Sequence, residues 1–448
     1  MRTTLDAHEL IDQASRLRKA NFGHARQFPG DGSARQPVHT VYGGAHLFRA
    51  DTARKLGTLA LKAMEEHAPD AAALAEAVGI GDAALAGKVH ARVAEKLRAE
   101  AVEDFRVDFE DGYGYRAGEE EDGHAVAAAR EMAAGLAAGT LPPFVGIRVK
   151  PLTEEHAERA VRTLDLFLTT LLDAGGGALP RGFVVTLPKV TSGEQVDFLG
   201  DVLQSLEPRL GLPVGSLPVE LMVETPQAVV GPDGRWGLPG LVRAGEGRVT
   251  GAHFGAYDYT AALGIAAAHQ SLRHPACDFA RAAMQASLAG TGVRLSDGAT
   301  TLLPVAPHRA GEGAALSDAQ AAENRAAVHR AWRLHYEDVR HALAGGFYQG
   351  WDLHPAQLVS RYAAVFAFFL EGVDETAARL RNFVERAAQA TRVGSVFDDA
   401  ATGQGLLNHF LRALACGALS EDEAAALTGL SPDALRARSF SAIVAGRS

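Results

Sequence analysis

Three carboxylates stand at the end of a short apolar run in the segment RVDFEDGYGYR, residues 106–116: Asp108, Glu110 and Asp111. The glycines that follow fit the G-x-G-x-x-A pattern of a dinucleotide-binding turn. A pyrophosphate needs positive potential, however, and four more acids follow at residues 119–122. The sign of the charge therefore favours a cation site over a phosphate cradle.

Charged side chains also end several other apolar runs of the chain. Glu224 and Asp258 offer carboxylate oxygens, which a hard divalent cation such as Mg²⁺, or Mn²⁺, prefers together with several waters. Arg148 has the planar fork that binds a carboxylate through two hydrogen bonds, and Lys189 adds a second positive charge. These residue types indicate a metal site beside a clamp for a substrate carboxylate.

Each of these residues also has a purely structural interpretation. Asp111 or Asp258 could cap the helix that follows it, and Arg148 could neutralise a neighbouring acid inside the protein. Lys150 and Lys189 could be charges at a solvent-exposed rim. Both interpretations stay open at the level of the sequence.

A purely structural interpretation applies less easily to Glu224 than to His354. Glu224 ends the apolar run ELMV, where an unpaired charge is costly, and the proline at position 226 disfavours a helical continuation. His354 precedes a proline and is more often a hydrogen-bonded turn residue than a base.

The elements that must position these side chains are short apolar runs separated by helical segments. Near-continuous hydrophobicity is typical of strands that are buried on both faces of a parallel sheet. Eight such strands with helices between them predict an α/β protein with a (β/α)₈ TIM barrel, in which the carboxyl ends of the strands converge on the active site. The runs lie at residues 37–44, 105–111, 144–151, 182–190, 218–225, 248–258, 300–307 and 345–355. Helices are predicted at residues 125–138, 154–173 and 318–343, the last with a capping box formed by Ser317 and Gln320.

Three regions exceed the simple strand–helix repeat. We divide the chain into an N-terminal helical extension (1–36), the barrel (37–360) with a helical insertion (51–103), and a C-terminal helical region (361–448) with a break near residues 403–405. The apolar stretch at 364–370 needs cover. We therefore expect the surplus helices to make subunit contacts in a homo-oligomer.

Composition and charge narrow the class of partner. The chain has 448 residues, a formal net charge of −10 and only two cysteines, Cys277 and Cys416. The negative charge disfavours nucleic acid and anionic membranes, and the few cysteines fit a reducing cytoplasm. No apolar run reaches the 18 or so residues of a membrane span, and acids stand where a signal peptide would have its apolar core. A cytoplasmic protein with a small-molecule substrate is expected.

Six of the strand-end segments, read together, resemble one known family. VDFEDGYG, GIRVKP, TLPKV, ELMVETPQA, HFGAYDYTAALG and GWDLHPAQL are similar, in order and spacing, to motifs of the citrate lyase β-subunit and HpcH/HpaI aldolase superfamily, which also contains malyl-CoA lyases. The similarity spans about residues 105–360. It implies a phosphoenolpyruvate/pyruvate-type barrel, assembled as trimers or hexamers, that cleaves or forms C–C bonds through an enolate.

The resemblance also implies a role for individual residues. Glu224 and Asp258 match the metal ligands, and Arg148 matches the arginine that holds the carboxylate and the enolate oxygen of the substrate. Glu110 and Asp111 match the acidic pair that holds metal-bound waters. Asp111 stands where the pyruvate-aldolase branch has a histidine base, so the general base is unassigned.

The expected function is a Mg²⁺-dependent carbon–carbon lyase for a 2-hydroxy or 2-oxo acid, free or as its CoA thioester. Arg148, Asp111 and Glu110 are the expected catalytic residues, Arg148 and Lys189 bind the substrate, and Glu224 and Asp258 bind the metal. A thioester hydrolase or malate-synthase-like condensing enzyme on the same scaffold is the alternative. A non-catalytic metal- and metabolite-binding homologue is a further one.

Overall fold

A closed barrel of eight parallel strands forms the centre of the molecule, as predicted. The computed structural model describes residues 7–30, 32, 34–311, 315–393 and 400–445. The strands follow one another around the barrel in chain order, and β1 pairs with β8 to close it. They are β1 (His39–Gly44), β2 (Asp104–Asp108), β3 (Phe144–Arg148), β4 (Phe183–Leu187), β5 (Val219–Val223), β6 (Val249–Phe254), β7 (Arg294–Ala299) and β8 (Gln349–Asp352).

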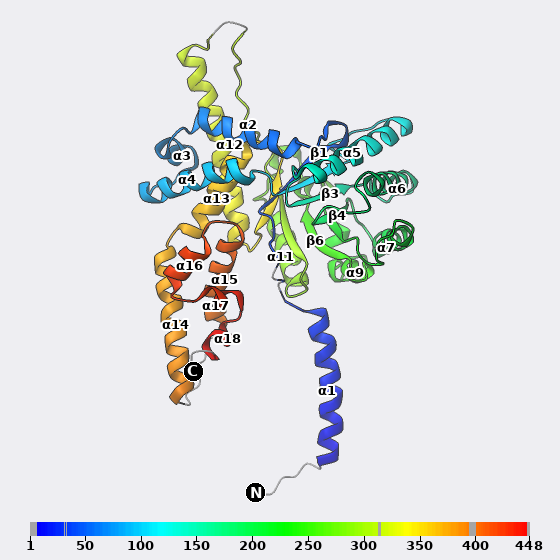
Figure 1. The fold of residues 1–448 in the computed structure, drawn as a ribbon, viewed down its shortest axis with the longest axis vertical. Coiled ribbons are helices and arrows are strands. Elements are labelled where there is room, and N and C mark those ends of the chain that lie inside the picture. Colours follow the sequence, from blue (N-terminus) through cyan, green and yellow to red (C-terminus); the bar gives the residue numbers. More distant parts are fainter. Residues whose placement is uncertain (1–6, 31, 33, 312–314, 394–399, 446–448) are drawn as a thin grey trace.

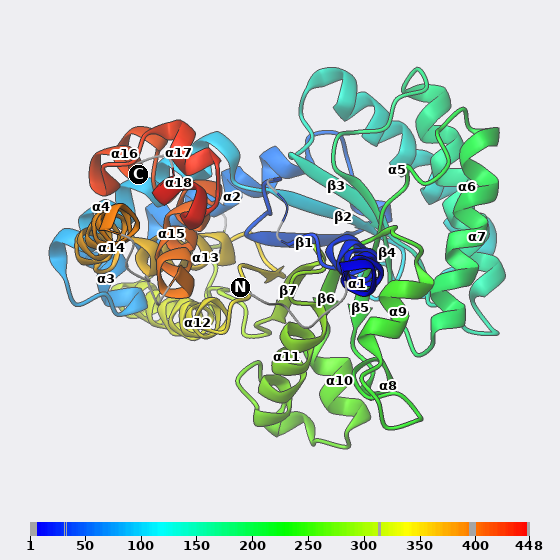
Figure 2. The same ribbon diagram turned by 90° about the horizontal axis from the view of Figure 1, so that it is seen from below.

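Helices surround the barrel and extend it on one side. Figures 1 and 2 show α5, α6 and α7 on one side of the barrel, and α2 to α4 together with α12 to α18 on the other. Helix α1 projects away from the body of the molecule (Figure 1). No helix among the described residues is long and apolar enough to cross a bilayer.

The helices before β7 are α1 (Ala7–Gln27), α2 (Thr52–His67), α3 (Ala71–Val78), α4 (Ala83–Glu100), α5 (Gly118–Ala138), α6 (Ala157–Ala174), α7 (Gly193–Arg209), α8 (Pro226–Val229), α9 (Leu238–Ala244), α10 (Ala256–Ala262) and α11 (Pro275–Leu288). Those after it are α12 (Asp318–Ala344), α13 (Gln357–Leu370), α14 (Val373–Val393), α15 (Ala400–Ala415), α16 (Glu421–Thr428), α17 (Pro432–Arg436) and α18 (Phe440–Ala445). Short 3₁₀ turns lie at Ala45–Leu47 and Ala267–His269.

Charged side chains fill part of the barrel interior. Arg106 on β2 reaches across it, donating from Nη2 to Oε2 of Glu220 on β5 at 2.6 Å and from Nε to Thr186 on β4 at 3.1 Å. Its third partner is Asp104, two residues earlier on its own strand. Because successive side chains of a strand alternate between faces, Asp104, Arg106 and Asp108 share the inner face of β2. The barrel therefore carries paired charges where a continuous apolar run was expected.

The seventh strand was predicted at the wrong place. β7 is RLSDGA at residues 294–299, whereas the predicted run TTLLPVAP at 300–307 is a loop. Two prolines interrupt that run, and Leu302 and Val305 are 37% and 46% exposed. The polar residues of β7 mean that it does not stand out as an apolar run. The strand can nevertheless be buried, because Arg281 neutralises Asp297 at a distance of 3.0 Å.

The predicted capping box was confirmed, but the break near residues 403–405 was wrong. Ser317 and Gln320 form the box at the start of α12. Gly403 and Gly405 both lie within α15. A Cβ atom at Gly403 would lie 2.6 Å from the ring of Phe440, so this glycine allows α18 to approach α15 rather than ending the helix.

The apolar stretch at 364–370 belongs to α13, which is covered by the chain itself. α13 packs against α4, α12 and α15. A buried ion pair links it to the preceding barrel strand. Arg361 donates from Nη2 to Asp352 at the end of β8 at 2.7 Å, and His335 of α12 lies 3.0 Å from the same carboxylate. The limit set at residue 360 falls inside α13. The expected trimer or hexamer stays a prediction that this stretch does not support.

Gly146 in β3 offers a test of the barrel packing. A methyl group there would lie 2.1 Å from the Val184 carbonyl oxygen of β4. We expect Gly146→Ala to lower the free energy of unfolding by at least about 1–3 kcal/mol, as measured by urea denaturation followed by circular dichroism. Gly200→Ala in α7, where a Cβ meets nothing within 4 Å, should raise it by about 0.5–1 kcal/mol. Equal stability of the two variants would contradict this packing.

Candidate active site at the carboxyl ends of the strands

Arg148 is held in a fixed orientation at the end of β3. Its partner Asp108 lies directly opposite on β2. Nε donates to Oδ1 of Asp108 at 2.7 Å and Nη2 donates to Oδ2 at 2.6 Å, which is the bidentate geometry that a planar guanidinium favours. The guanidinium also lies over the rings of Tyr42, at 4.7 Å, and Trp351, at 5.4 Å. Arg148 therefore cannot rotate without breaking a buried ion pair.

The free end of this arginine faces the acidic turn. Nη1 of Arg148 lies 3.0 Å from Oε2 of Glu110 and 3.5 Å from the sulfur of Met222. Burial alone would lower the pKa of Arg148, but the carboxylates of Asp108 and Glu110 raise it above its ordinary value. The side chain is thus a permanent cation at this end of the barrel.

Lys189 is the centre of the acidic cluster. Its Nζ lies 2.5 Å from Glu110, 3.2 Å from Asp111 and 3.2 Å from Asp258. Its backbone N donates to Oε1 of Glu224 at 2.6 Å. The backbone φ of Lys189 is +49°, in the left-handed region that residues with a side chain rarely adopt. Such strain persists only where the surroundings fix it, and it often marks a functional site.

Glu224 is buried at the end of β5 and has an altered acidity. Burial, followed by the negative charges of Asp258 and Glu110, raises its pKa to about 8, although Lys189 acts in the opposite direction. A Cβ atom at Gly255 would lie 2.4 Å from Oε2 of Glu224. The glycine that follows β6 is therefore needed to leave room for this carboxylate.

The six residues expected to form the site are brought together. Glu110, Asp111, Glu224 and Asp258 all contact Lys189, and Arg148 joins the cluster through Glu110. The capping alternatives find no support among the described contacts. Helix α5 has Ala117 at its N-cap without a side-chain cap, and the N-cap of α10 is Gly255. The interpretation of Arg148 as the partner of a neighbouring acid does hold, since it pairs with Asp108.

Two strand-end residues lie apart from the cluster. Lys150 donates from Nζ to the Phe109 carbonyl oxygen at 2.8 Å and lies 3.2 Å from Glu121 of α5. Nδ1 of His354 accepts from the backbone N of Ala356 at 3.2 Å, as expected for a turn histidine. Burial lowers the pKa of His354. Neither side chain is placed to act on a substrate at Lys189.

The charge balance of the cluster bears on the expected metal. Four carboxyl groups meet one ammonium there, because the charge of Arg148 is already neutralised by Asp108. Even with Glu224 protonated in the metal-free protein, three carboxylates exceed the one ammonium. Among the described residues no group of three or more His, Cys, Asp and Glu side chains is arranged to hold a metal ion. Mg²⁺ keeps several waters and needs only one or two carboxylates, however. By donor type and surplus negative charge, Glu224 and Asp258 fit such an ion, with Lys189 as its competitor.

Sequence reasoning missed the aromatic side chains that flank Arg148. Tyr42 lies in β1 and Trp351 lies in β8. From these two apolar runs, only the histidine at the end of the second one was considered as a site residue. Alternation along the strands could have found them, since inner-face positions near the carboxyl end of a barrel strand point toward the site. Their aromatic identity at those positions is the available signal.

This arrangement defines a (β/α)₈-barrel protein with an acidic, arginine-containing cluster at the carboxyl ends of its strands. The model of the family described as "Domain of unknown function (DUF6986)" matches residues 17–443, and the chain belongs to this family. No match is found among curated proteins.

Solved structures with a similar fold include enzymes of the kind that the motifs resemble. A citrate lyase from Burkholderia xenovorans LB400 is 20% identical with a TM-score of 0.53, over 89% of this chain and 98% of that one. A malate synthase from Haloferax volcanii, in a complex with magnesium and glyoxylate, is 13% identical with a TM-score of 0.47, over 92% and 99%. An HpcH/HpaI aldolase from Desulfitobacterium hafniense DCB-2 is 13% identical with a TM-score of 0.36, over 74% and 91%. The likeness to the citrate lyase shows a shared fold. The likenesses to the malate synthase and to the aldolase are weaker.

The raised pKa of Glu224 predicts how stability depends on pH in the metal-free protein. The folded state binds this proton up to about pH 8, whereas an unfolded glutamate releases it near its ordinary pKa of 4.5. Folding stability is therefore fully present below that value and falls as the pH rises toward 8. In a chelator, Glu224→Gln should gain stability relative to the wild type between pH 5 and pH 8.

Thermal denaturation across this range measures the difference. Glu158→Gln, at an exposed position of α6, is the matched control and should track the wild type. If the melting temperature of Glu224→Gln changed with pH in parallel with that of the wild type, the buried carboxyl would not be protonated in the folded state.

Proposed function

We propose that the protein is a metal-dependent carbon–carbon lyase acting on a 2-oxo or 2-hydroxy acid, free or as a CoA thioester. The observation that carries the proposal is the fixed guanidinium of Arg148 beside a cluster of four carboxylates, at the end of a barrel where strand ends and loops form active sites. The citrate-lyase-like fold supports it at the level of the scaffold.

Arg148 would bind and orient the substrate. Asp108 holds its Nε and Nη2, so Nη1, which lies 3.0 Å from Oε2 of Glu110, is the donor that a substrate carboxylate or oxygen anion would take over from Glu110. The flanking rings of Tyr42 and Trp351 keep the guanidinium plane fixed. A donor that is already oriented stabilises developing negative charge without reorganisation, which is often the largest contribution to catalysis. Lys189 offers a second cation to the same substrate.

A divalent cation would be held by Glu224 and Asp258. When bound, it would supply Lewis-acid stabilisation of negative charge on a substrate oxygen. Glu110 and Asp111, beside it, would accept hydrogen bonds from its waters. This role fits their position around Lys189, whose ammonium balances part of the same negative charge.

Cleavage next to a hydroxyl also requires a proton acceptor. The hydroxyl proton leaves, the C–C bond breaks, and its electron pair is delocalised onto the neighbouring carbonyl as an enolate. Asp111 is the exposed carboxylate of the cluster, with a side chain 60% accessible. Burial acts to raise its pKa, but Lys189 and Arg148 lower it overall, so the carboxylate is unprotonated at neutral pH. We assign the base to Asp111 on this ground.

The metal assignment predicts a change in Mn²⁺ binding. The double variant Glu224→Gln, Asp258→Asn should lose at least about tenfold in affinity, measured by calorimetry, because amide oxygens carry no charge for a hard cation. Lys189→Gln should bind Mn²⁺ more tightly than the wild type, since the competing ammonium is gone. Unchanged affinity in the double variant would rule out these ligands.

The substrate clamp predicts a kinetic effect. Arg148→Lys should lower turnover by at least about 10²-fold, the scale seen when one oxyanion donor is lost, because lysine cannot hold Asp108 through two hydrogen bonds and also present a fixed donor to the substrate. Release of a 2-oxo acid or of free thiol from a panel of 2-hydroxy acids, 4-hydroxy-2-oxo acids and their CoA thioesters measures it. The loss should appear in kcat as well as in KM, since the contact strengthens as charge develops.

Arg162→Lys, at an exposed ion pair with Asp122 of α5, is the matched control and should keep full activity. Circular dichroism and Mn²⁺ binding of Arg148→Lys separate loss of the clamp from loss of the fold. A folded variant with wild-type kcat would show that Arg148 only neutralises Asp108. No turnover of any member of the panel by the wild type would contradict the lyase proposal itself.

A further inference from the structure

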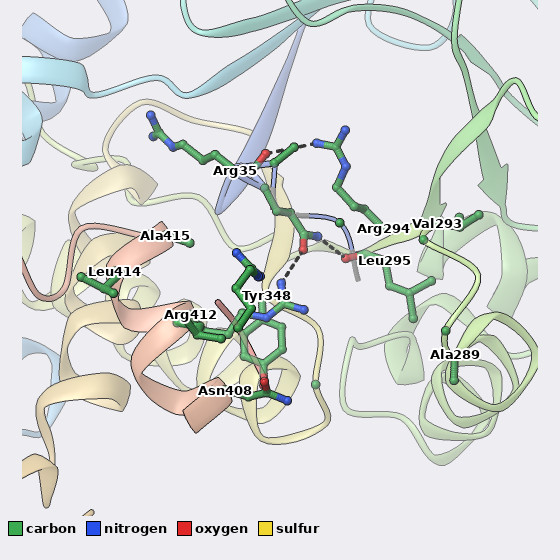
Figure 3. A pocket seen from close by; sticks show the side chains of 18 of the residues that line it. Arg35, Ala289, Val293, Arg294, Leu295, Tyr348, Asn408, Arg412, Leu414 and Ala415 are labelled. Carbon is green, nitrogen blue, oxygen red and sulfur yellow. Dashed lines mark hydrogen bonds between the residues drawn. The ribbon is translucent and has the colours of Figure 1, made fainter. Parts of the chain in front are cut away.

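A second cavity lies at the opposite end of the barrel from the acidic cluster. Its volume is about 1280 Å³, and it opens between the amino end of β7, the connector that precedes β1, and helices α11, α15 and α17 (Figure 3). Arg294 and Leu295 line it from the first residues of β7, whereas the candidate active site is built at the last residues of the strands. The two sites are therefore separate.

The lining of this cavity is positively charged in a chain whose net charge is −10. Five arginines contribute to it, at positions 35, 294, 412, 436 and 438. A single carboxylate, Glu421, belongs to the lining, and it lies 2.7 Å from Arg436, which also pairs with Asp433. Arg35 pairs with Glu100 and Glu103, which lie outside the lining, so the excess comes from the other arginines. Such a local excess of guanidinium groups in a recess favours an anion.

The contacts of Arg294 are with neutral groups. Its Nη1 donates to the Arg35 carbonyl oxygen at 3.4 Å, and its guanidinium lies 5.8 Å from the ring centre of Phe144. Both partners are neutral. Among the residues that the structure describes, no carboxylate lies within ion-pair distance of it. The side chain is half-buried, so its charge is only partly screened by water.

A hydrogen-bonded chain orients a second guanidinium toward the same space. Gln36 donates from Nε2 to the Leu295 carbonyl oxygen at 3.1 Å, and its Oε1 accepts from Nη1 of Arg412 at 3.0 Å. Arg412 also lies 4.4 Å from the ring centre of Tyr348 (Figure 3). Stacking on Tyr348 and the hydrogen bond to the Gln36 amide fix the guanidinium plane of Arg412. A planar donor of fixed orientation suits the oxygens of a phosphate group.

The lining also has an apolar part beside its polar side chains. Leu288 of α11, Leu411 and Leu414 of α15, and Leu435 of α17 contribute to it beside the arginines. A cavity of this size exceeds the space that an inorganic anion needs, and mixed linings of this kind bind small organic ligands. An occupant with both an anionic and an apolar part fits the two halves of the surface.

We propose that this cavity binds a phosphorylated organic molecule of nucleotide size, with its phosphates at Arg294 and Arg412 and its apolar part against the leucines. The proposal is independent of the lyase function, because no residue of the acidic cluster takes part. It assigns a ligand site to the surface between the barrel and its C-terminal helices.

Calorimetry and thermal-shift measurements on the full chain in a chelator test the proposal with ATP, pyrophosphate and adenosine as probes. The wild type should bind ATP more tightly than pyrophosphate, and adenosine at least about tenfold more weakly than ATP, because charge-assisted hydrogen bonds to phosphate dominate. Arg294→Gln should weaken ATP binding at least about tenfold. Arg54→Gln, exposed on α2, should leave it unchanged.

A second pair of variants keeps the test decisive if Arg294→Gln fails to fold. Ala289 lines the cavity at an exposed position after α11. Ala289→Glu adds a negative charge there and should weaken ATP binding, whereas the isosteric Ala289→Gln should weaken it less. The proposal is overturned if the wild type does not bind ATP at millimolar concentration. It is equally overturned if ATP and pyrophosphate bind with equal affinity, or if Ala289→Glu and Ala289→Gln bind ATP alike.

Discussion

The pairing of charges inside the closed barrel is the constraint on which the rest of this structure depends. Arg106 links β2 to β4 and β5, and Arg148 links β3 to β2 through Asp108. A buried charge without its partner would be costly, so each of these strands can take only the register that completes the pairs. The same pairs place the last residue of each strand, and the candidate site is built from those last residues.

Lys189 gives the acidic cluster an internal counter-ion. Its ammonium balances carboxylates that come from the turn after β2 and from α10, and its backbone N binds Glu224 after β5, so the cluster can form without any ligand. The left-handed backbone of Lys189 directs its N–H toward Glu224 while the side chain spans the other acids. A cation that enters this site must offset the loss of those contacts, which links metal affinity to the position of a single lysine.

The sequence predicts the barrel well, because parallel strands buried on both faces leave short apolar runs that helices separate. It also predicts the six cluster residues, since strand-end charges are few and converge by geometry. The position of Lys189 at their centre could not be predicted, although the residue itself was, because its side chain is directed by a left-handed backbone that no residue pattern specifies. β7 was missed for a related reason. Its Asp297 depends on a partner in the preceding helix α11, and no residue pattern indicates that pairing, so the polar segment resembled a loop.

The insertion between β1 and β2 has a consequence for how the chain acquires its structure during synthesis. α4 is made early, yet its apolar face is covered by α13, which begins more than two hundred residues later. Val89, Val93 and Leu97 of α4 are each at most 3% exposed in the finished protein. On the ribosome α2 and α3, which also contact α4, are made before it, but the part under α13 has no native cover until most of the barrel has emerged. The lobe formed by these helices must therefore mature late, and its exposed α4 is a natural substrate for chaperones that bind apolar helices of nascent chains.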